Sequence, residues 1–300
     1  MPNDLFIAET ESLLPIREIS RATGVNTVTL RAWERRYGLL VPQRTSKGHR
    51  LYSESDIQRV KAIQVWLARG VAISKVKALL ANETEADFDK NIDSVWTSVA
   101  SQIDAAINAF SRSRLEHLLA DTFALYPVEI VADNVLIPLL KNLKIDAPGY
   151  GAKRAFFCSV LQEYLQAAIY RQRQATRGEK IFLVSLCPDV MDLEPVILQY
   201  SIMAHQHKVE YFGYQDVKEA LICAEALQPK IVVLAGYGTK AANGLSQYIK
   251  AWREKNEMPI VLTGNLALVH PALELPASQG VHSSVAMQQI HSAIHHLLKE

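Results

Sequence analysis

Arginine and lysine side chains gather in the first quarter of this 300-residue chain, where their number and spacing suit contacts with a polyanion. Residues 14–80 contain thirteen Lys and Arg against four Asp and Glu, whereas residues 81–300 contain nineteen against twenty-four. Thr27, Arg31 and Arg35 recur every four residues, which places them on one face of a helix. Arginines on such a face can bond guanine edges or backbone phosphates in the major groove. The pattern therefore favours duplex DNA as the ligand of this region.

Two predicted helices and a hairpin would position these cations. Residues 16–22 have apolar side chains at helical spacing, and Gly24 favours a turn after them. Asn26 or Thr27 can cap a second helix, the one that carries the arginines. Two short extended runs follow, joined by a polar, glycine-containing turn, and predict a β-hairpin wing. This wing would bring four cationic or imidazole side chains to the phosphate backbone: Arg44, Lys47, His49 and Arg50.

The run TLRAWERRYGLL, followed by PQRT and GHRLY, resembles the winged-helix domain of the MerR family of transcription regulators, and within it the MlrA-like branch. The resemblance implies a dimer that distorts promoter DNA for RNA polymerase and activates genes, with biofilm-matrix and stress genes as expected targets. The residues expected to meet DNA, including two added from charge alone, Arg36 and Lys47, are Thr27, Thr29, Arg31, Arg35, Arg36, Tyr37, Arg44, Lys47, His49, Arg50 and Tyr52.

Two alternatives remain open for individual side chains in this region. Any single arginine could simply solvate a charged helix face, because many surface arginines do so. The aromatic residues Trp33 and Tyr37 could equally pack between the helix and the wing. The prediction of DNA binding therefore depends on the combination of turn, arginine stripe and wing.

Three further segments are expected after this head, which we place at residues 14–81. An acidic, polar stretch at 82–94 predicts a linker. Residues 95–175 contain about four apolar stripes at helical spacing, which predicts a four-helix bundle. Residues 179–300 alternate strand and helix patterns, with strands expected at 180–185, 209–212, 231–235 and 259–263 and a last helix at 285–298. This alternation predicts a flavodoxin-like, doubly wound parallel sheet and makes the whole chain an α+β multidomain protein.

A helical bundle followed by such a sheet resembles the cobalamin-binding module behind the head of CarH-like light-dependent repressors. In that module a D-x-H-x-x-G motif supplies the histidine that binds cobalt from below, and the bundle supplies a tryptophan and a Glu-His pair. The positions that match these motifs here are Asp189, Met191 and Glu194 in the first motif, and Tyr126, Asp133 and Asn134 in the bundle.

These replacements change what the module could bind. Met191 has no second ring nitrogen for a supporting hydrogen bond, and Glu194 adds bulk and charge where glycine permits close backbone approach. We therefore expect neither cobalamin nor another cofactor. Ligands of doubly wound sheets bind beyond the carboxyl ends of the strands, so the loops at 187–193, 213–216 and 236–244 form the candidate pocket for a small molecule or a regulatory protein.

Cysteine and histidine spacing gives no metal or disulfide prediction. The three cysteines are scattered and form no C-x-x-C pair. The histidine groups have no acidic or thiolate neighbour in sequence, so we expect no metal site, and solvated surface side chains at His205, His207, His291, His295 and His296.

The remaining motifs argue for a regulator rather than an enzyme. The chain has no G-x-S-x-G, H-E-x-x-H or Walker A run. No apolar run reaches the roughly 18 residues that a membrane span needs, and the unpaired cysteines suit a reducing compartment, so a cytoplasmic protein is expected. The first hypothesis is a sequence-specific transcription regulator, and the alternative is a repressor that responds to cobalamin or another ligand.

Overall fold

The computed structural model describes residues 13–81, 94–145, 147–174, 176–189, 191–236, 245–254, 258–264, 266, 281–284 and 286–298. All of the predicted linker except Ser94 lies outside the described residues, and so does the predicted ligand loop after Gly236. Among the described residues, no helix combines the length and apolarity that crossing a membrane requires.

The head is a winged helix-turn-helix, as predicted. Gly24 ends the first helix with φ at 71°, a left-handed conformation that glycine adopts without strain. The Asn26 side chain accepts a hydrogen bond from the Val28 amide and so caps the second helix. The third helix begins with a capping box between Ser53 and Asp56. The elements are β1 (Leu14–Pro15), α1 (Ile16–Thr23), α2 (Thr27–Tyr37), β2 (Gln43–Arg44), β3 (Arg50–Tyr52), α3 (Glu54–Ala68) and α4 (Ile73–Ala81).

The wing contains one strand more than the predicted hairpin. β3 pairs with β2 on one side and with β1 on the other, both antiparallel. β1 has only two residues, too few to show a period-2 pattern in the sequence.

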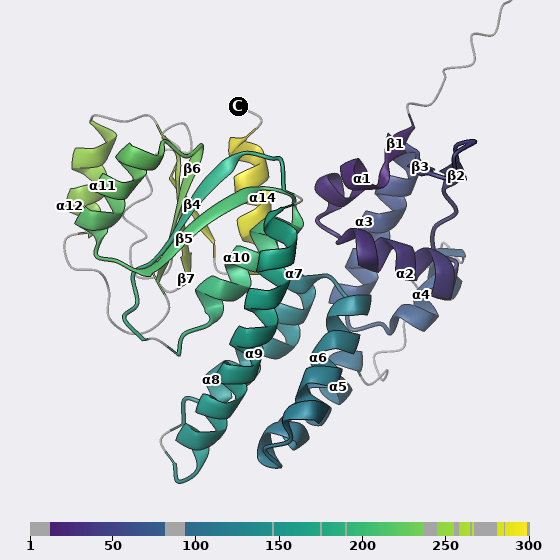
Figure 1. Cartoon of the computed structure of the whole chain (residues 1–300), viewed down its shortest axis with the longest axis horizontal. Coiled ribbons are helices and arrows are strands. Elements are labelled where there is room, and N and C mark those ends of the chain that lie inside the picture. The colour runs from purple at the N-terminus through teal and green to yellow at the C-terminus, as the bar shows by residue number, and fades with distance from the viewer. Residues whose placement is uncertain are drawn as a thin grey trace, which may run out of the picture.

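The middle of the chain is helical, with long helices that run downward in Figure 1. The third of them contains a π-helical segment, η2, between two α-helical pieces. The elements are α5 (Val95–Asn108), α6 (Arg112–Leu125), α7 (Val128–Val131), η2 (Ala132–Leu136), α8 (Ile137–Asn142) and α9 (Tyr150–Arg173).

The C-terminal part is a five-stranded parallel sheet with the order β5-β4-β6-β7-β8, the order of flavodoxin-like folds. Alternate strand residues face opposite sides, so α10 and α14 cover one face and α11 and α12 the other. The elements are β4 (Lys180–Ser185), α10 (Glu194–Ala204), β5 (Lys208–Tyr214), α11 (Val217–Leu227), β6 (Ile231–Gly236), α12 (Leu245–Arg253), β7 (Ile260–Gly264), β8 (Val281–Ser284) and α14 (Met287–Leu297).

The predicted fold class is confirmed, and one strand of the sheet was missed. β8 pairs only with β7 at the edge of the sheet, and its sequence Val-His-Ser-Ser has no apolar run. An edge strand has only one strand neighbour and needs no continuous apolar sequence, so nothing in the pattern distinguished it from a loop.

The three parts share one continuous apolar core. Buried side chains extend without a break from Ile19 in α1 through the bundle to Leu297 in α14. Two indole groups join the parts by hydrogen bonds: Trp33 Nε1 donates to the Leu125 carbonyl at 2.8 Å, and Trp96 Nε1 donates to the Leu67 carbonyl at 3.0 Å. The head and the sheet consequently stand side by side above the bundle (Figure 1).

Candidate functional site

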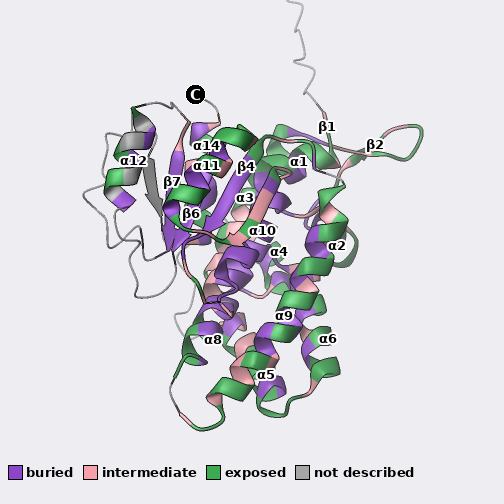
Figure 2. Ribbon diagram, turned by 60° about the vertical axis from the view of Figure 1, so that its left-hand side comes forward, coloured by how far each residue is buried: buried purple, intermediate pink, exposed green. Residues whose placement is uncertain are grey.

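Helix α2 presents a basic outer face opposite its buried face. Leu30 and Trp33 have no exposed surface and fix the inner side of the helix. Arg31, Arg35 and Arg36 are exposed, and Thr27 is half-buried at the first position of the helix. Exposed residues lie along α2 and around the β2 turn in Figure 2. The helix therefore exposes three guanidinium groups, and the packing of its buried face fixes its position.

One residue of this face was not predicted from sequence. Val28 is 56% exposed and lies one helical turn before Arg31. An exposed branched side chain on a groove-facing helix can contact the methyl group of thymine. The sequence places Val28 three residues before Arg31 and therefore on the same side of the helix. Its apolar side chain, however, suggested a position in the core.

The wing is held to α2 by a carboxylate that was also missed. Glu34 Oε1 accepts a hydrogen bond from Arg44 Nη2 at 2.8 Å, and Glu34 Oε2 accepts one from Arg50 Nε. Partial burial alone would raise the pKa of Glu34, but the hydrogen bonds and charges of Arg50 and Arg44 hold this pKa below its usual range. These two arginines thus set the position of the wing, while Lys47 and His49 remain exposed at its turn.

Two of the predicted DNA-contacting residues are core residues instead. Thr29 is 1% exposed and Tyr52 is fully buried, and burial raises the pKa of the Tyr52 hydroxyl to about 12. A side chain without exposed surface cannot reach a duplex unless the fold rearranges, so the prediction for these two is wrong. Tyr37 is half-buried and packs against the core.

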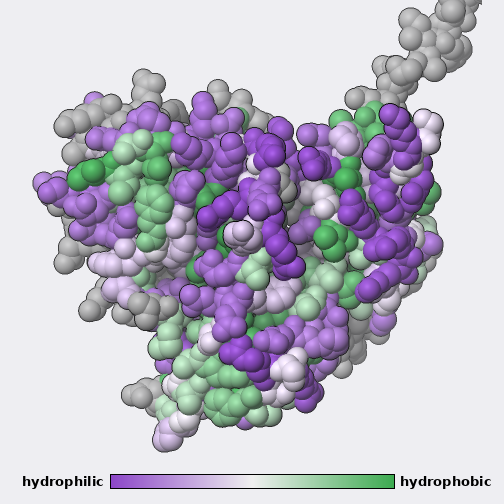
Figure 3. Space-filling model, in the orientation of Figure 1, coloured by the Kyte–Doolittle hydropathy of each residue, from purple (hydrophilic) through white to green (hydrophobic). Residues whose placement is uncertain are grey.

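Much of the head surface that faces the viewer in Figure 3 is hydrophilic.

The residues that match the histidine motif of the corrinoid module are engaged by the protein itself. Arg154 Nη2 donates to Asp189 Oδ2 at 2.5 Å. The Met191 carbonyl accepts a hydrogen bond from the Cys158 thiol at 3.5 Å, and the Met191 side chain packs on the core. Glu194 is 4% exposed, and burial, with the charge of Asp192 beside it, raises the pKa of its carboxyl group to about 7.

The matching bundle positions also have structural partners. Tyr126 packs edge-on against Trp96, with ring centroids 4.8 Å apart. Asp133 accepts a hydrogen bond from the Met287 amide at 3.1 Å, which places a carboxylate at the N-terminus of α14. Asn134 donates to the Ile130 carbonyl within its own helix. In this chain Tyr126 therefore joins the end of α6 to α5, and Asp133 joins η2 to α14.

The prediction of solvated surface histidines is wrong for His205 and His291. The two imidazole rings stack with centroids 4.0 Å apart, and His291 is 8% exposed. Glu129, the acidic neighbour that the local sequence lacks, comes from α7. It lies 3.2 Å from His205 Nε2 and 3.4 Å from His291 Nε2, both measured to Oε1.

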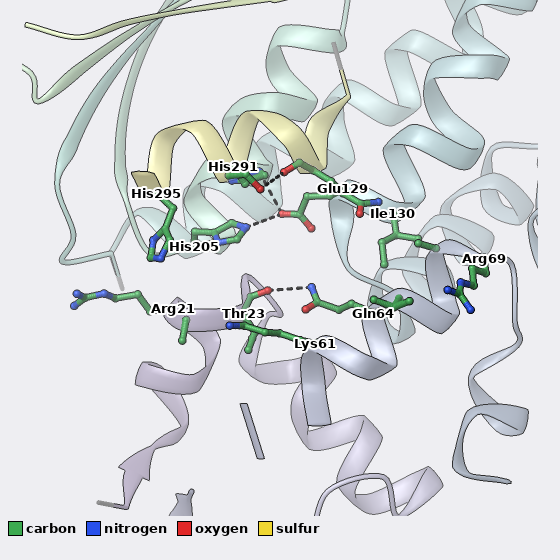
Figure 4. A pocket seen from close by; sticks show the side chains of 15 residues that line it. Arg21, Thr23, Lys61, Gln64, Arg69, Glu129, Ile130, His205, His291 and His295 are labelled. Atoms are coloured by element: carbon green, nitrogen blue, oxygen red, sulfur yellow. Dashed lines mark hydrogen bonds and ion pairs between the residues drawn. The ribbon is translucent and has the colours of Figure 1, made fainter. Parts of the chain in front are cut away.

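This cluster lies on a cavity of about 520 Å³ between the head and the C-terminal half. Figure 4 shows Glu129, His205 and His291 on one wall, with Arg21, Thr23 and Gln64 of the head on the opposite wall.

The cluster is not a hydrolytic triad. The Ser201 hydroxyl and the Glu129 carboxylate both approach Nε2 of His291, whereas a triad needs them on opposite ring nitrogens.

Comparison with known proteins agrees with this architecture. Residues 14–83 match the family model "MerR HTH family regulatory protein". The HTH-type transcriptional regulator MlrA of Escherichia coli is 33% identical over 163 residues, which cover 54% of this chain and 65% of that protein. The alignment thus spans just under two thirds of MlrA. The HTH-type transcriptional repressor CarA of Myxococcus xanthus is 25% identical over 86% of this chain and 88% of its own length.

The fold and the exposed basic helix define a winged helix-turn-helix protein with a two-part C-terminal half. The mercuric resistance operon regulatory protein of Bacillus cereus is 34% identical over 35% of this chain and 80% of its own length. The chain belongs to the MerR family. Part of the chain resembles the monomethylamine corrinoid protein of Methanosarcina barkeri, with a TM-score of 0.50 and 12% identity over 66% of this chain and 98% of that one. At this identity the likeness concerns the fold alone.

Proposed function

We propose that the protein binds duplex DNA through its head and regulates transcription. The observation that carries the proposal is the exposed arginine face of α2, with the wing fixed to the same helix by Glu34. Arg31 and Arg35 would meet base edges or phosphates in the major groove, and Lys47 and His49 the backbone beside it. MlrA and CarA, to which this chain is similar, are named as a transcriptional regulator and a transcriptional repressor and support this assignment.

The contribution of the helix face is measurable with the full chain. Purified protein would first select its binding sequence from a pool of random duplexes. We expect Arg31→Ala to weaken binding to the selected sequence by about 1–3 kcal/mol if Arg31 reads a base. Arg114→Ala, an exposed arginine on α6, is the matched control and should bind like wild type. An equal loss on selected and random DNA would reduce Arg31 to a phosphate contact, and no loss on either would remove α2 from the interface.

The wider regulatory role is part of the same proposal. A homodimer would place two heads on an inverted repeat and distort the promoter so that RNA polymerase engages both of its elements, at a cost of several kcal/mol offset by the paired contacts. The selected sequence should then be palindromic. We propose activation, with biofilm-matrix or stress genes as targets in the cytoplasm, and transcription with purified polymerase tests the sign.

The residues at the motif positions do not fit a cobalamin held by a lower histidine ligand. Met191 replaces that ligand, and the buried Glu194 carboxyl group occupies the position where the motif requires glycine. We propose that the C-terminal half acts without a corrinoid. A corrinoid absorbance spectrum in the purified protein, or a rise in melting temperature with cobalamin, would instead favour the ligand-responsive repressor.

A further inference from the structure

Three ligand-type side chains from distant parts of the sequence converge in this fold. Glu129 comes from α7, His205 follows α10, and His291 lies on α14. One carboxylate oxygen and two imidazole nitrogens all lie within 4.8 Å of one another. This set is separate from the DNA-facing side of α2 and from the positions of the corrinoid motif.

The spacing of these atoms fits the edges of a small coordination shell. In a tetrahedral zinc site with bonds of about 2.0–2.1 Å, two ligand atoms lie about 3.3–3.4 Å apart. The Glu129 oxygen lies 3.2 Å from the His205 nitrogen and 3.4 Å from the His291 nitrogen. The two rings now stack 20° from parallel, so binding one ion through both nitrogens requires one imidazole to turn out of the stack.

The surroundings of the cluster support a bound ion. Glu129 is 4% exposed, and its second oxygen, Oε2, is buried without a hydrogen-bond partner among the described residues. A buried carboxylate oxygen in that state carries an unfavourable desolvation cost, which a cation would offset. Ser201 donates a hydrogen bond to Oε1 at 3.0 Å and so orients the carboxylate, as second-sphere groups do at metal sites.

The carboxylate and both imidazoles of the cluster line the same cavity. His205 borders the 520 Å³ cavity, so water or a small anion can complete the shell from that side. The positive charges of Arg21, Lys61 and Arg69 in the cavity wall favour an anion or hydroxide in this position.

We propose that Glu129, His205 and His291 form a binding site for a divalent transition-metal ion of the kind that prefers imidazole, with Zn²⁺ as its representative. Imidazole and carboxylate ligands together suit Zn²⁺, Ni²⁺ or Cu²⁺ better than Mg²⁺ or Ca²⁺, which prefer oxygen shells.

The site would also contact the DNA-binding head. A Cβ atom placed on Gly24 would lie 2.1 Å from Cε1 of His205, so this ring packs directly on the turn between α1 and α2. Gln64, which lines the same cavity, donates to the Thr23 carbonyl in that turn. A metal ion that moves the His205 ring would thus act on the element that sets the angle of α2. This consequence depends on the proposed function, whereas metal binding itself does not.

Metal binding is tested on the full chain without DNA. Protein freed of metal with a chelator is titrated with ZnCl₂ by calorimetry, and with CoCl₂ by visible absorption, which reports coordination geometry. We expect one equivalent of Zn²⁺ to bind and raise the melting temperature, and Co²⁺ to give the absorption of a four-coordinate site. Absence of saturable binding at one equivalent in the wild-type protein overturns the proposal.

Two variants assign the binding to this cluster. Glu129→Gln and His205→Gln should each weaken Zn²⁺ binding at least about 100-fold, since even loss of a second-sphere partner costs 10–100-fold. His296→Gln is the matched control, because His296 is exposed on the same helix as His291 and outside the cavity. Circular dichroism of the metal-free proteins selects the variants that fold, and one folded variant is enough for the test. Unchanged affinity in it would place the ion elsewhere and overturn the assignment.

A separate measurement addresses the effect on the head. If the ion acts on the turn, saturating Zn²⁺ should change the affinity of wild-type protein for its selected DNA several-fold and leave that of His205→Gln unchanged. Equal DNA affinity with and without Zn²⁺ would reject the coupling but leave the metal site intact. Failure to bind any DNA sequence would instead count against the proposed function.

Discussion

The outer face of α2 and the 187–194 segment, which is the predicted ligand loop with the first residue of α10, are both places where a family resemblance locates a ligand, yet their polar groups are used differently. On α2 the arginines are exposed, and the one carboxylate of that face, Glu34, binds the two wing arginines. In the loop, Asp189 is paired with Arg154 and Glu194 is buried. The comparison teaches that charges left at the surface can serve an external ligand, whereas a charge that is paired inside the protein, like Asp189, or buried, like Glu194, is withdrawn from one.

Trp33 joins α2 to the bundle, so its removal should have the largest effect. Trp33→Ala deletes a fully buried indole and its hydrogen bond to Leu125 of the bundle. We expect the free energy of unfolding to fall by about 3–5 kcal/mol, measured by urea denaturation. Trp33→Phe keeps most of the packing and should cost about 1–2 kcal/mol through the unpaired carbonyl. If Trp33→Ala unfolded like wild type, the head would not be docked on the bundle.

The buried carboxyl group of Glu194 gives the second prediction. The pKa of this group in the folded protein, about 7, exceeds its ordinary value of 4.5. Its contribution to stability is therefore fully present below pH 4.5 and is lost as the pH rises through 7. Glu194→Gln should remove this pH dependence and stabilise the protein at pH 8 by about 1–3 kcal/mol. Glu225→Gln, at an exposed site on α11, should leave the melting curves unchanged.

If Glu194→Gln, like Glu225→Gln, left the melting curves unchanged at every pH, the contrast between this loop and the head would be smaller. That result would mean that water reaches the carboxyl group, so that the loop is open to a ligand.

Glu34→Gln separates the position of the wing from the charge of the head. The substitution adds one unit of positive charge, which by itself strengthens attraction to DNA. We nevertheless expect DNA affinity to fall about tenfold, because Arg44 and Arg50 lose the carboxylate that orients the wing. Fluorescence anisotropy with the selected duplex measures this. Stronger binding would show that net charge matters more than the position of the wing.

Lys47 should give the smallest effect. It is exposed in the wing turn and is expected to contact phosphate only. Lys47→Ala should weaken selected and random DNA alike and lower the slope of log affinity against log salt by about 1. Lys208→Ala, exposed in the C-terminal half, should change neither the affinity nor the slope. A loss confined to the selected sequence would assign base recognition to the wing.

Elements with strong local patterns were predicted well from sequence. The helix-turn-helix, the bundle and four of the five parallel strands follow from helical spacing, glycine turns and buried apolar runs. β1 and β8 were missed because edge strands of two and four residues carry no such pattern. The exposed arginines of α2 were also predicted, since helical spacing places them opposite Leu30 and Trp33.

The sequence by itself determined the basic helix, its turn and the order of helices and strands, because these depend on residues a few positions apart. Only the tertiary structure decided that Thr29 and Tyr52 are buried, that Glu34 binds the wing, and that Glu129 meets His205 and His291. Glu129 and His291 lie 162 positions apart in sequence. Such contacts depend on how α7, α10 and α14 pack together, and local spacing contains no information about that packing.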